Sequence, residues 1–289
     1  MNSPSFKRGN PSNKKEKERN GSRIAESQSR PMRIVVFDTE TTSIEKPFAY
    51  NIGYVIYDTD TERVLVRKDF VAEQIWHNRE LFTTAYYEDK RDEYIKRMRA
   101  KTCRMDKLGR ITQEMLRDFK MYEVECAFAY NSSFDERVFT FNCEWFKIIN
   151  PFDDIPIYDI RGYVHQYIAF DPDFQKFCDD NKRYTEGGNY STTAETLYQY
   201  LFECTDFVEE HMALADSNIE LEILIECVNK GAEWGKAYKV YSSIPRLVDK
   251  VLEIKCVDGS TTTLPYQKIT VYKEKENKTK ILLKNRPTK

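Results

Sequence analysis

The stretch RIVVFDTETT, residues 33–42, places Asp38 and Glu40 directly after a run of β-branched and aromatic residues. Such a run is typical of a buried strand. Side chains two positions apart on a strand share a face, so both carboxylates point to the same side. Two like charges at a partly buried edge are costly unless a cation lies between them, and oxygen ligands favour Mg²⁺ or Mn²⁺. An isolated D-x-E pattern also occurs at solvated strand ends and helix caps, so the metal interpretation needs further acids.

The composition sets limits on the class of protein. The chain has 289 residues, 40% of them hydrophobic, which suffices for one large core with appendages or for two small domains. The chain lacks an apolar run near the roughly 18 residues of a membrane span, and its N-terminus carries charge where a signal peptide is apolar. We therefore expect a cytoplasmic globular protein without a membrane partner. Its seven Cys are scattered without a C-x-x-C pair and are expected to be reduced core thiols.

The two ends of the chain are basic, although the formal net charge is only -2. Residues 1–31 are poor in apolar side chains and are predicted to be a disordered arm, either touching nucleic acid or only solubilising. Residues 236–289 are predicted to be a basic extension with two or three strands and a turn at residues 258–260. This extension could dock a DNA polymerase or another partner, enlarge a nucleic-acid surface, or only add to the fold.

Residues 32–235 have the pattern of a single α/β domain. Apolar runs predict one strand over 32–37, a hairpin over 51–58 and 63–71, a further strand over 124–130 and a strand-like segment over 155–160. Residues 74–120 are helical in character, and further helices are expected after residue 131 and over 160–178, 193–203 and 213–230. This order predicts a mixed β-sheet flanked by helices.

A third acid follows the predicted strand 124–130. In AYNSSFDERV, residues 129–138, the strand ends at Tyr130, Asn131 and two serines turn the chain, and Asp135 begins the next helix. This places Asp135 at the carboxyl edge of the sheet, where α/β proteins bind ligands. The alternative is that Asp135 only complements the helix dipole, which contributes up to about 1 kcal/mol.

A fourth acid lies near the apolar stripe of a later helix. In HMALADSNIELEIL, residues 211–224, Asp216 lies on or beside the face that carries Ile219 and Ile223. A carboxylate on a buried face needs a partner, and a metal ion is a good one. His211 would lie about 140° away on a regular helix, so we expect it in the preceding loop or first turn. Taken alone, a histidine such as His211 is more often an ordinary surface or capping residue.

Together, FDTETT, NSSFD and HMALAD resemble in order the motifs D-x-E, N-x-x-F-D and H-x-A-x-x-D of the DEDDh 3′–5′ exonucleases. This family belongs to the ribonuclease-H-like superfamily and includes proofreading subunits, ribonuclease T and oligoribonuclease. The resemblance spans roughly residues 32–230. It implies metal binding by Asp38, Glu40, Asp135 and Asp216, and a general-base role for His211.

The resemblance also implies contacts with the terminal nucleotide. The residues concerned are Thr41, Thr42 and Ile44 after the first motif, and Asn131 in the second. The family commonly has Gly where this chain has Ser43. Since Gly lets a ligand approach the backbone closely, the contacts at Ser43 are expected to differ from those in the family.

The implied activity is release of nucleoside 5′-monophosphates from single-stranded 3′ ends with two Mg²⁺ or Mn²⁺ per active site. His211, with an ordinary pKa near 6.5, suits proton removal near neutral pH. Single-stranded DNA is the favoured substrate, with a proofreading role beside a DNA polymerase. The alternatives are an RNA-trimming or oligoribonuclease-type enzyme, and a non-catalytic nucleic-acid or partner-binding module on the same fold.

Residues 84–104 interleave Tyr86, Tyr87 and Tyr94 with Lys and Arg side chains. Aromatic rings for stacking and cations for phosphate are what a single strand needs. The same residues could instead pair along a solvated helix, where Asp92 with Lys96 and Glu93 with Arg97 are four positions apart. Both interpretations stay open from the sequence.

Overall fold

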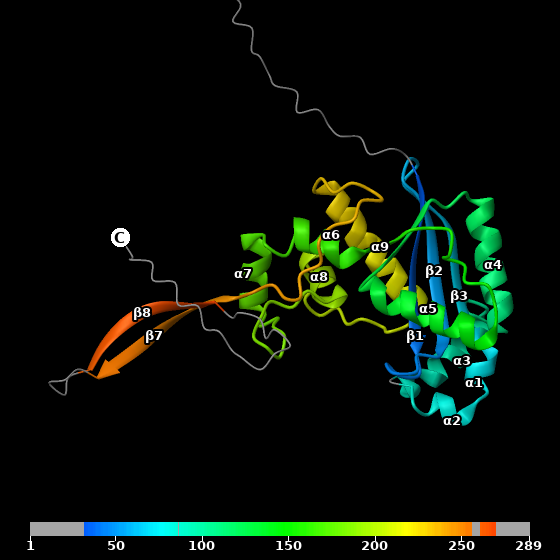
Figure 1. The fold of residues 1–289 in the computed structure, drawn as a ribbon, viewed down its shortest axis with the longest axis horizontal. Helices are drawn as coiled ribbons and strands as arrows, with labels where there is room; N and C mark the ends of the chain where they lie inside the picture. Colours follow the sequence, from blue (N-terminus) through cyan, green and yellow to red (C-terminus); the bar gives the residue numbers. More distant parts are fainter. Residues whose placement is uncertain (1–31, 86, 256–260, 270–289) are drawn as a thin grey trace, which may run out of the picture.

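A computed structural model of the chain describes residues 32–85, 87–255 and 261–269. Its centre is a mixed six-stranded sheet in the order β4-β3-β2-β1-β5-β6, and Figure 1 shows helices flanking it. The antiparallel pairs are β1–β2 and β2–β3, and the other neighbours are parallel. The strands are β1 (Arg33–Thr41), β2 (Ala49–Asp58), β3 (Arg63–Ala72), β4 (Arg104–Asp106), β5 (Cys126–Ala129) and β6 (Ile157–Asp159). The predicted α/β class is confirmed.

Helices cover both faces of β1. Val35 and Phe37 belong to one apolar core, and Ile34 and Val36 belong to a second core on the other face. Burial on both faces explains the continuous apolar run before Asp38. The helical elements are α1 (Glu73–Trp76), α2 (Arg79–Phe82), η1 (Glu88–Lys90), α3 (Arg91–Ala100), α4 (Leu108–Met121), α5 (Ser132–Phe146), α6 (Ile160–Tyr167), α7 (Pro172–Asp180), α8 (Ala194–Leu201) and α9 (Ala213–Asn229).

Two predicted helical regions are corrected. The helix expected over 160–178 is two helices, α6 and α7, because Asp171 accepts a bond from the Asp173 N–H at 3.0 Å and Pro172 begins a new helix. The helical region 74–120 is interrupted by the short strand β4, which pairs with β3. The helices predicted over 193–203 and 213–230 agree with α8 and α9 at their ends to within two residues.

The C-terminal part contains an antiparallel hairpin of β7 (Leu247–Lys255) and β8 (Thr261–Ile269), which extends away from the sheet in Figure 1. These are two of the strands predicted there, and the predicted turn lies outside the described residues, as does the predicted N-terminal arm. Before the hairpin, Tyr238 and Ile244 pack against the second core. Within the described residues, no helix is both long and apolar enough to cross a bilayer.

The described cysteines are free thiols, five of them buried and Cys204 partly exposed. This agrees with the predicted reduced state, and Cys256 lies outside the described residues.

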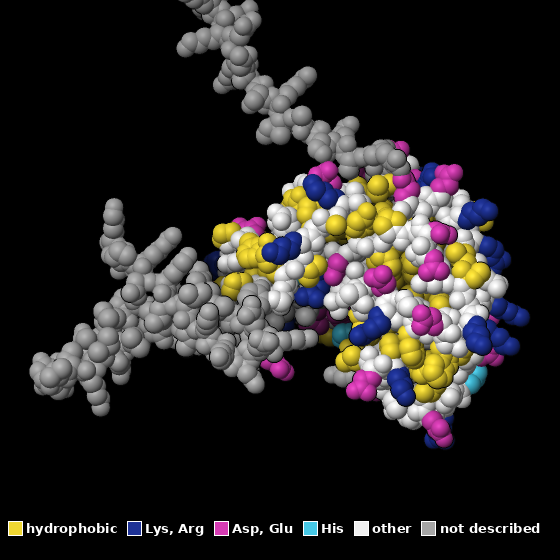
Figure 2. Space-filling model, viewed as in Figure 1, with side chains coloured by type: hydrophobic (Ala, Val, Ile, Leu, Met, Phe, Trp, Pro, Cys, Tyr) yellow, Lys and Arg dark blue, Asp and Glu magenta, His cyan; other side chains and the backbone are white. Residues whose placement is uncertain are grey.

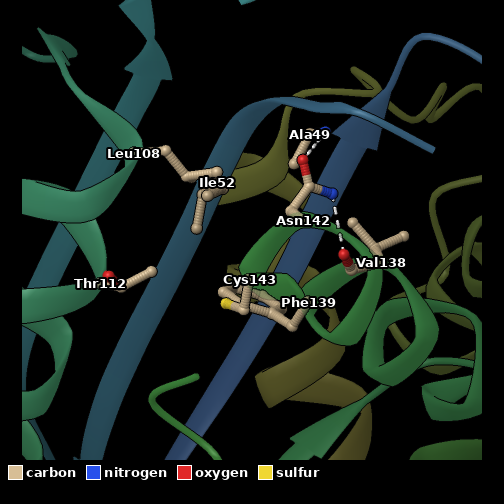
Figure 3. A pocket seen from close by; sticks show the side chains of 8 residues that line it. All are labelled: Ala49, Ile52, Leu108, Thr112, Val138, Phe139, Asn142 and Cys143. Carbon is tan, nitrogen blue, oxygen red and sulfur yellow. Dashed lines mark hydrogen bonds between the residues drawn. The ribbon is translucent and has the colours of Figure 1, made fainter. Parts of the chain in front are cut away.

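The buried Cys143 lines a small apolar pocket between α4, α5 and β2, shown in Figure 3. In the same view the Asn142 side chain bridges α5 and β2: it accepts from the Ala49 N–H at 3.3 Å and donates to the Val138 carbonyl at 2.8 Å. A further bond to the Pro47 carbonyl fixes the end of the loop that follows β1.

Helix α9 packs directly on β2 because Gly53 has no side chain. A Cβ atom at Gly53 would lie 2.1 Å from the backbone nitrogen of Leu214. Around this contact the Ala213 N–H donates to Asn51 Oδ1 at 2.9 Å, and the Ser217 hydroxyl donates to the Gly53 carbonyl at 3.2 Å. The first turn of α9, which contains Asp216, is therefore fixed against the sheet beside β1.

We predict that Gly53→Ala destabilises the protein by at least about 1–3 kcal/mol, because the added methyl group has to displace the α9 backbone. Thermal denaturation measures the effect as a lower midpoint. Gly187→Ala is the matched control, since its Cβ would meet atoms no closer than 3.5 Å. Equal midpoints for the two variants would contradict the direct packing of α9 on β2.

Candidate active site

The five residues singled out in the three motifs line one pocket. The pocket has a volume of about 560 Å³ and lies at the carboxyl end of β1. Its walls include residues from β1, α5, α9 and the loop before α9. The structure therefore brings together the predicted residues Asp38, Glu40, Asp135, His211 and Asp216. The acids come from separate parts of the chain, so it is the fold that collects them.

Asp135 lies in the first turn of α5, as predicted, and is 2% exposed. The chain turns at Asn131, which has a φ of 63° in the left-handed region, a conformation that Asn tolerates better than most residues. The Thr39 hydroxyl donates to Asp135 Oδ1 at 2.6 Å. This buried bond joins α5 to β1 between the two carboxylates of the first motif, and no local sequence pattern indicates it.

Asp216 has the chemistry of a metal ligand. It is 4% exposed, and within the described part of the chain its Oδ1 atom has no hydrogen-bond partner. A buried carboxylate oxygen without a donor is costly, and a divalent cation would satisfy it. Ligand atoms of Glu40, His211 and Asp216 lie within 4.8 Å of one another. These residues fit a cation, whereas Asp38 and Asp135 line the same pocket outside this close group, and their metal binding stays a prediction.

Two further acids in the pocket were missed by the sequence analysis. Glu220 is 3% exposed on α9, and its Oε2 accepts from the Tyr130 N–H at 3.3 Å. It follows Asp216 by four residues, a spacing that places both on one side of a helix and could have identified it. Glu209 lies in the loop before α9, where its N–H donates to Glu195 Oε2 at 3.2 Å. The sequence around Glu209 carries no comparable signal.

The carboxylates of the pocket resist ionisation. Burial, followed by the charge of Glu209, raises the pKa of Asp216 from 3.8 to about 8. Burial raises the pKa of Asp135 to about 7, against the Thr39 bond, which lowers it. The pKa values of Asp38 and Glu40 are also raised by burial, with added repulsion from neighbouring acids. Protons or cations are needed to offset this charge.

His211 lies in the loop that precedes α9, as predicted, and has a φ of 49°. Burial lowers the pKa of its imidazole below 6.5, and the nearby Lys90 ammonium adds to this effect. The imidazole is therefore neutral near pH 7 and able to accept a proton. The ring of Tyr87 is stacked on it, with ring centroids 4.4 Å apart and an angle of 11° between the planes.

Of the four residues predicted to contact the terminal nucleotide, one lines the pocket and three lie outside its lining. Asn131 lines the pocket, and its Oδ1 accepts from Arg161 Nη1 at 3.1 Å. Thr41, Thr42 and Ile44 are not among the lining residues. They lie at the end of β1 and in the loop after it, where Ile44 is 73% exposed. Substrate contact by all four residues stays a prediction.

Hydrogen bonds close the loop that follows β1. The Thr42 N–H donates to the Phe48 carbonyl at 3.0 Å, and its hydroxyl donates to the Lys46 carbonyl at 3.3 Å. Ser43, which stands where the resembling family has Gly, accepts from the Lys46 N–H at 3.1 Å. The Ser43 side chain thus contributes to the shape of the loop.

The aromatic and basic segment 84–104 divides between core and pocket. Tyr94 is fully buried and its hydroxyl donates to Asn51, so it does not offer a stacking surface, while Tyr87 lines the pocket. Glu93 pairs with Arg97 at 3.6 Å, as the helical interpretation predicted, and with Lys96 at 3.3 Å. Tyr86 lies outside the described residues. Figure 2 shows acidic and basic side chains interspersed over the visible face. The described residues on this face therefore present no large basic patch that would indicate a binding surface for nucleic acid.

Comparisons with known proteins find likeness in fold. A scan against protein-family models and a sequence search of curated proteins give no match. A 3′-exonuclease whose structure concerns 3′-end specific recognition of histone mRNA stem-loop is 12% identical, with 82% of this chain and 92% of that chain covered and a TM-score of 0.50. The nuclease domain of 3′hExo, a DEDDh family member bound to rAMP, is 12% identical over 76% of this chain and 100% of that domain, with a TM-score of 0.49.

A third solved structure is E. coli exonuclease I in complex with a dA16 oligonucleotide. It is 14% identical, with 68% of this chain covered and a TM-score of 0.43, and the match spans 41% of that protein's length. The likeness to the 3′-exonuclease of the histone mRNA stem-loop structure establishes the fold alone: this chain shares the mixed six-stranded sheet flanked by helices. The fold implied by the three motifs is confirmed.

We predict that in chelator the folded state loses stability as the pH rises from about 4 to about 8. Asp135 and Asp216 have folded pKa values of about 7 and about 8 against 3.8 for the free side chain. The folded chain therefore binds more protons than the unfolded chain in this range, and deprotonation favours unfolding. Thermal denaturation at several pH values measures the midpoint.

Mg²⁺ should raise the midpoint more at pH 8 than at pH 6, because the ligands bind it in deprotonated form. Asp216→Asn should flatten the pH dependence in chelator. The control Glu136→Gln changes an exposed acid next to Asp135 and should leave the slope unchanged. A melting midpoint that rises with pH in chelator would contradict the raised pKa values of the buried carboxylates.

Proposed function

We propose that the protein is a metal-dependent 3′–5′ exonuclease that releases nucleoside 5′-monophosphates from single-stranded nucleic acid ends. The observation that carries this proposal is the convergence of Asp38, Glu40, Asp135, Asp216 and His211 in one pocket at the carboxyl end of β1. The fold shared with a 3′-exonuclease supports it. A non-catalytic binding module would have no need of a buried acid cluster beside a neutral imidazole.

The acids would hold Mg²⁺ or Mn²⁺, and we propose two ions per site. Glu40 and Asp216 are the best supported ligands, because their oxygens lie close together and Asp216 Oδ1 has no other partner among the described residues. Asp38 and Asp135 complete the proposed set. Bound divalent ions would lower the pKa of a coordinated water and offset the charge that develops on the phosphate.

His211 is proposed as the general base. Its neutral imidazole can take a proton from the attacking water near pH 7, since its pKa is lowered. Arg161 lines the same pocket, and its Nη1 donates to Asn131 Oδ1 at 3.1 Å. Its guanidinium is suited to a phosphate oxygen, because Arg forms strong charge-assisted bonds to phosphate.

We propose single-stranded DNA as the favoured substrate, with a proofreading role beside a DNA polymerase. RNA trimming is the second candidate, because one fold neighbour is described with a histone mRNA stem-loop. Matched DNA and RNA oligonucleotides of the same sequence distinguish the two. Faster turnover of the RNA strand would favour trimming over proofreading.

Asp38→Asn and Asp135→Asn are each expected to abolish turnover, since each variant removes one negative charge from the proposed metal site. The assay follows a 5′-labelled single strand in Mg²⁺ or Mn²⁺. Glu136→Gln should cleave like the unaltered protein, because Glu136 is exposed and outside the pocket. Near-normal cleavage by either Asn variant would refute the metal assignment.

His211→Ala should lower kcat by about 10²–10⁴-fold, the usual effect of losing a positioned general base. Stabilisation by Mg²⁺ should survive in this variant if the acids are the main ligands. If Mg²⁺ no longer raises the melting midpoint of His211→Ala, the histidine is a ligand, and its proposed role is wrong.

The direction of attack is tested with the end of the strand. A 3′–5′ exonuclease should convert a 5′-labelled strand into a ladder that shortens by one nucleotide at a time, and a bulky 3′ blocking group should slow it greatly. A circular single strand should resist cleavage. Equal cleavage of circular and linear strands would indicate an endonuclease on the same fold.

A further inference from the structure

The segment around η1 touches the loop that carries His211. The Tyr87 ring is stacked on the His211 imidazole, 4.4 Å away between centroids. Three residues later, Lys90 donates to the backbone carbonyl of Glu210, and its ammonium lies 4.8 Å from the Tyr87 ring centroid. Arg97, on the following helix α3, forms an ion pair with the Glu210 carboxylate. The loop before α9 is thus held from one side by three side chains, which we name the Tyr87 clamp.

The His211 loop is in need of such support. The φ of 49° at His211 lies in the left-handed region, where a residue with a Cβ is disfavoured. Residues in this conformation persist only when the surroundings hold them. On the α9 side the chain is fixed by Met212, which is 1% exposed in the core. On the other side the contacts at Glu210 and on the imidazole itself come from the Tyr87 clamp.

Helix α3, which carries Arg97 of the clamp, and helix α9, which follows the loop, are both bonded to one atom of Asn51. Tyr94 of α3 donates its hydroxyl hydrogen to Asn51 Oδ1 at 3.0 Å, and the Ala213 N–H donates to the same oxygen at 2.9 Å. Asn51 is fully buried on β2. The α3 end of the clamp, at Arg97, therefore has a fixed position relative to α9, and Tyr87 and Lys90 lie in the segment that leads directly into α3.

We propose that Tyr87 is a positioning residue that holds the His211 imidazole against the carboxylates of the pocket, with Lys90 holding the Glu210 carbonyl and Arg97 the Glu210 carboxylate beside it. This inference rests on the general-base role proposed for His211. A base acts only within hydrogen-bond reach of the water, and a displacement of about 1 Å can lower the rate by about 10²-fold. A flat ring stacked on the imidazole restricts its tilt. Without the stack, a side chain on a loop would adopt several orientations.

The other reading of Tyr87 is a stacking platform for a base of the substrate. The two roles separate in steady-state kinetics. Loss of a positioning residue lowers kcat, because fewer bound complexes have the base in place, and leaves KM nearly unchanged. Loss of a substrate platform raises KM.

The kinetic test compares Tyr87→Leu and Tyr87→Phe on a single-stranded oligonucleotide in Mg²⁺. We expect Tyr87→Leu to lower kcat by about 10-fold to 10²-fold with KM within about twofold, while Tyr87→Phe keeps the stack and restores kcat. Tyr122→Leu, a partly buried tyrosine at the end of α4, is the control for general loss of a ring. A raised KM with unchanged kcat in Tyr87→Leu, or equal defects in the Leu and Phe variants, would overturn the proposal.

A second measurement does not depend on activity. The chain contains three histidines, so imidazole signals in NMR spectra are few, and the one lost in His211→Ala belongs to His211. A stacked aromatic ring moves that signal upfield; Tyr87→Leu should remove the shift and Tyr87→Phe should retain it. An unchanged signal in Tyr87→Leu would overturn the stack. If the shift behaves as expected in a chain without nuclease activity, the clamp stands and the proposed function fails.

Discussion

The buried side chain of Asn51 connects the parts of the molecule on which the site depends. Its amide nitrogen donates to Asp69 Oδ1 at 2.6 Å and to the Phe70 carbonyl at 2.9 Å, both on the neighbouring strand β3. Its oxygen accepts from Tyr94 and from the first N–H of α9. Buried amides are costly when their bonds are incomplete, so this arrangement specifies one relative position of β3, α3 and α9. The other features of the pocket are arranged around that position.

The acids are held close together by apolar packing in which their own side chains take no part. Strand β1 is buried in a separate core on each face, and α9 lies on β2 without an intervening side chain. This packing supplies the free energy that offsets the repulsion among the carboxylates. Burial first, and repulsion from neighbouring acids second, raises the pKa values of Asp38 and Asp216. A cation at the proposed site would relieve this repulsion without any movement of the ligands, because the fold prevents them from relaxing apart.

Much of the site could be predicted from local patterns. The period of two on β1 placed Asp38 and Glu40 together, and the turn after β5 placed Asp135 at a helix start. The features that could not be predicted depend on contacts between distant segments. The need for Gly at position 53 arises only when α9 is seated on β2, and the stacking of Tyr87 on His211 joins residues far apart in the chain. Glu220 is an intermediate case, since its spacing from Asp216 was visible but its burial was not.

Because α9 packs directly on Gly53, Asp216 is harder to displace than His211. Asp216 lies two residues after Leu214, about 3 Å along the helix from the backbone contact, so moving it requires separation of a helix from a sheet. His211 lies in the loop before that helix, and moving it requires only the loss of a ring contact and bonds at Glu210. Local opening takes the path of least free energy. The His211 loop can therefore yield locally while Asp216 on α9 keeps its place against the sheet, although the two side chains lie within one close group.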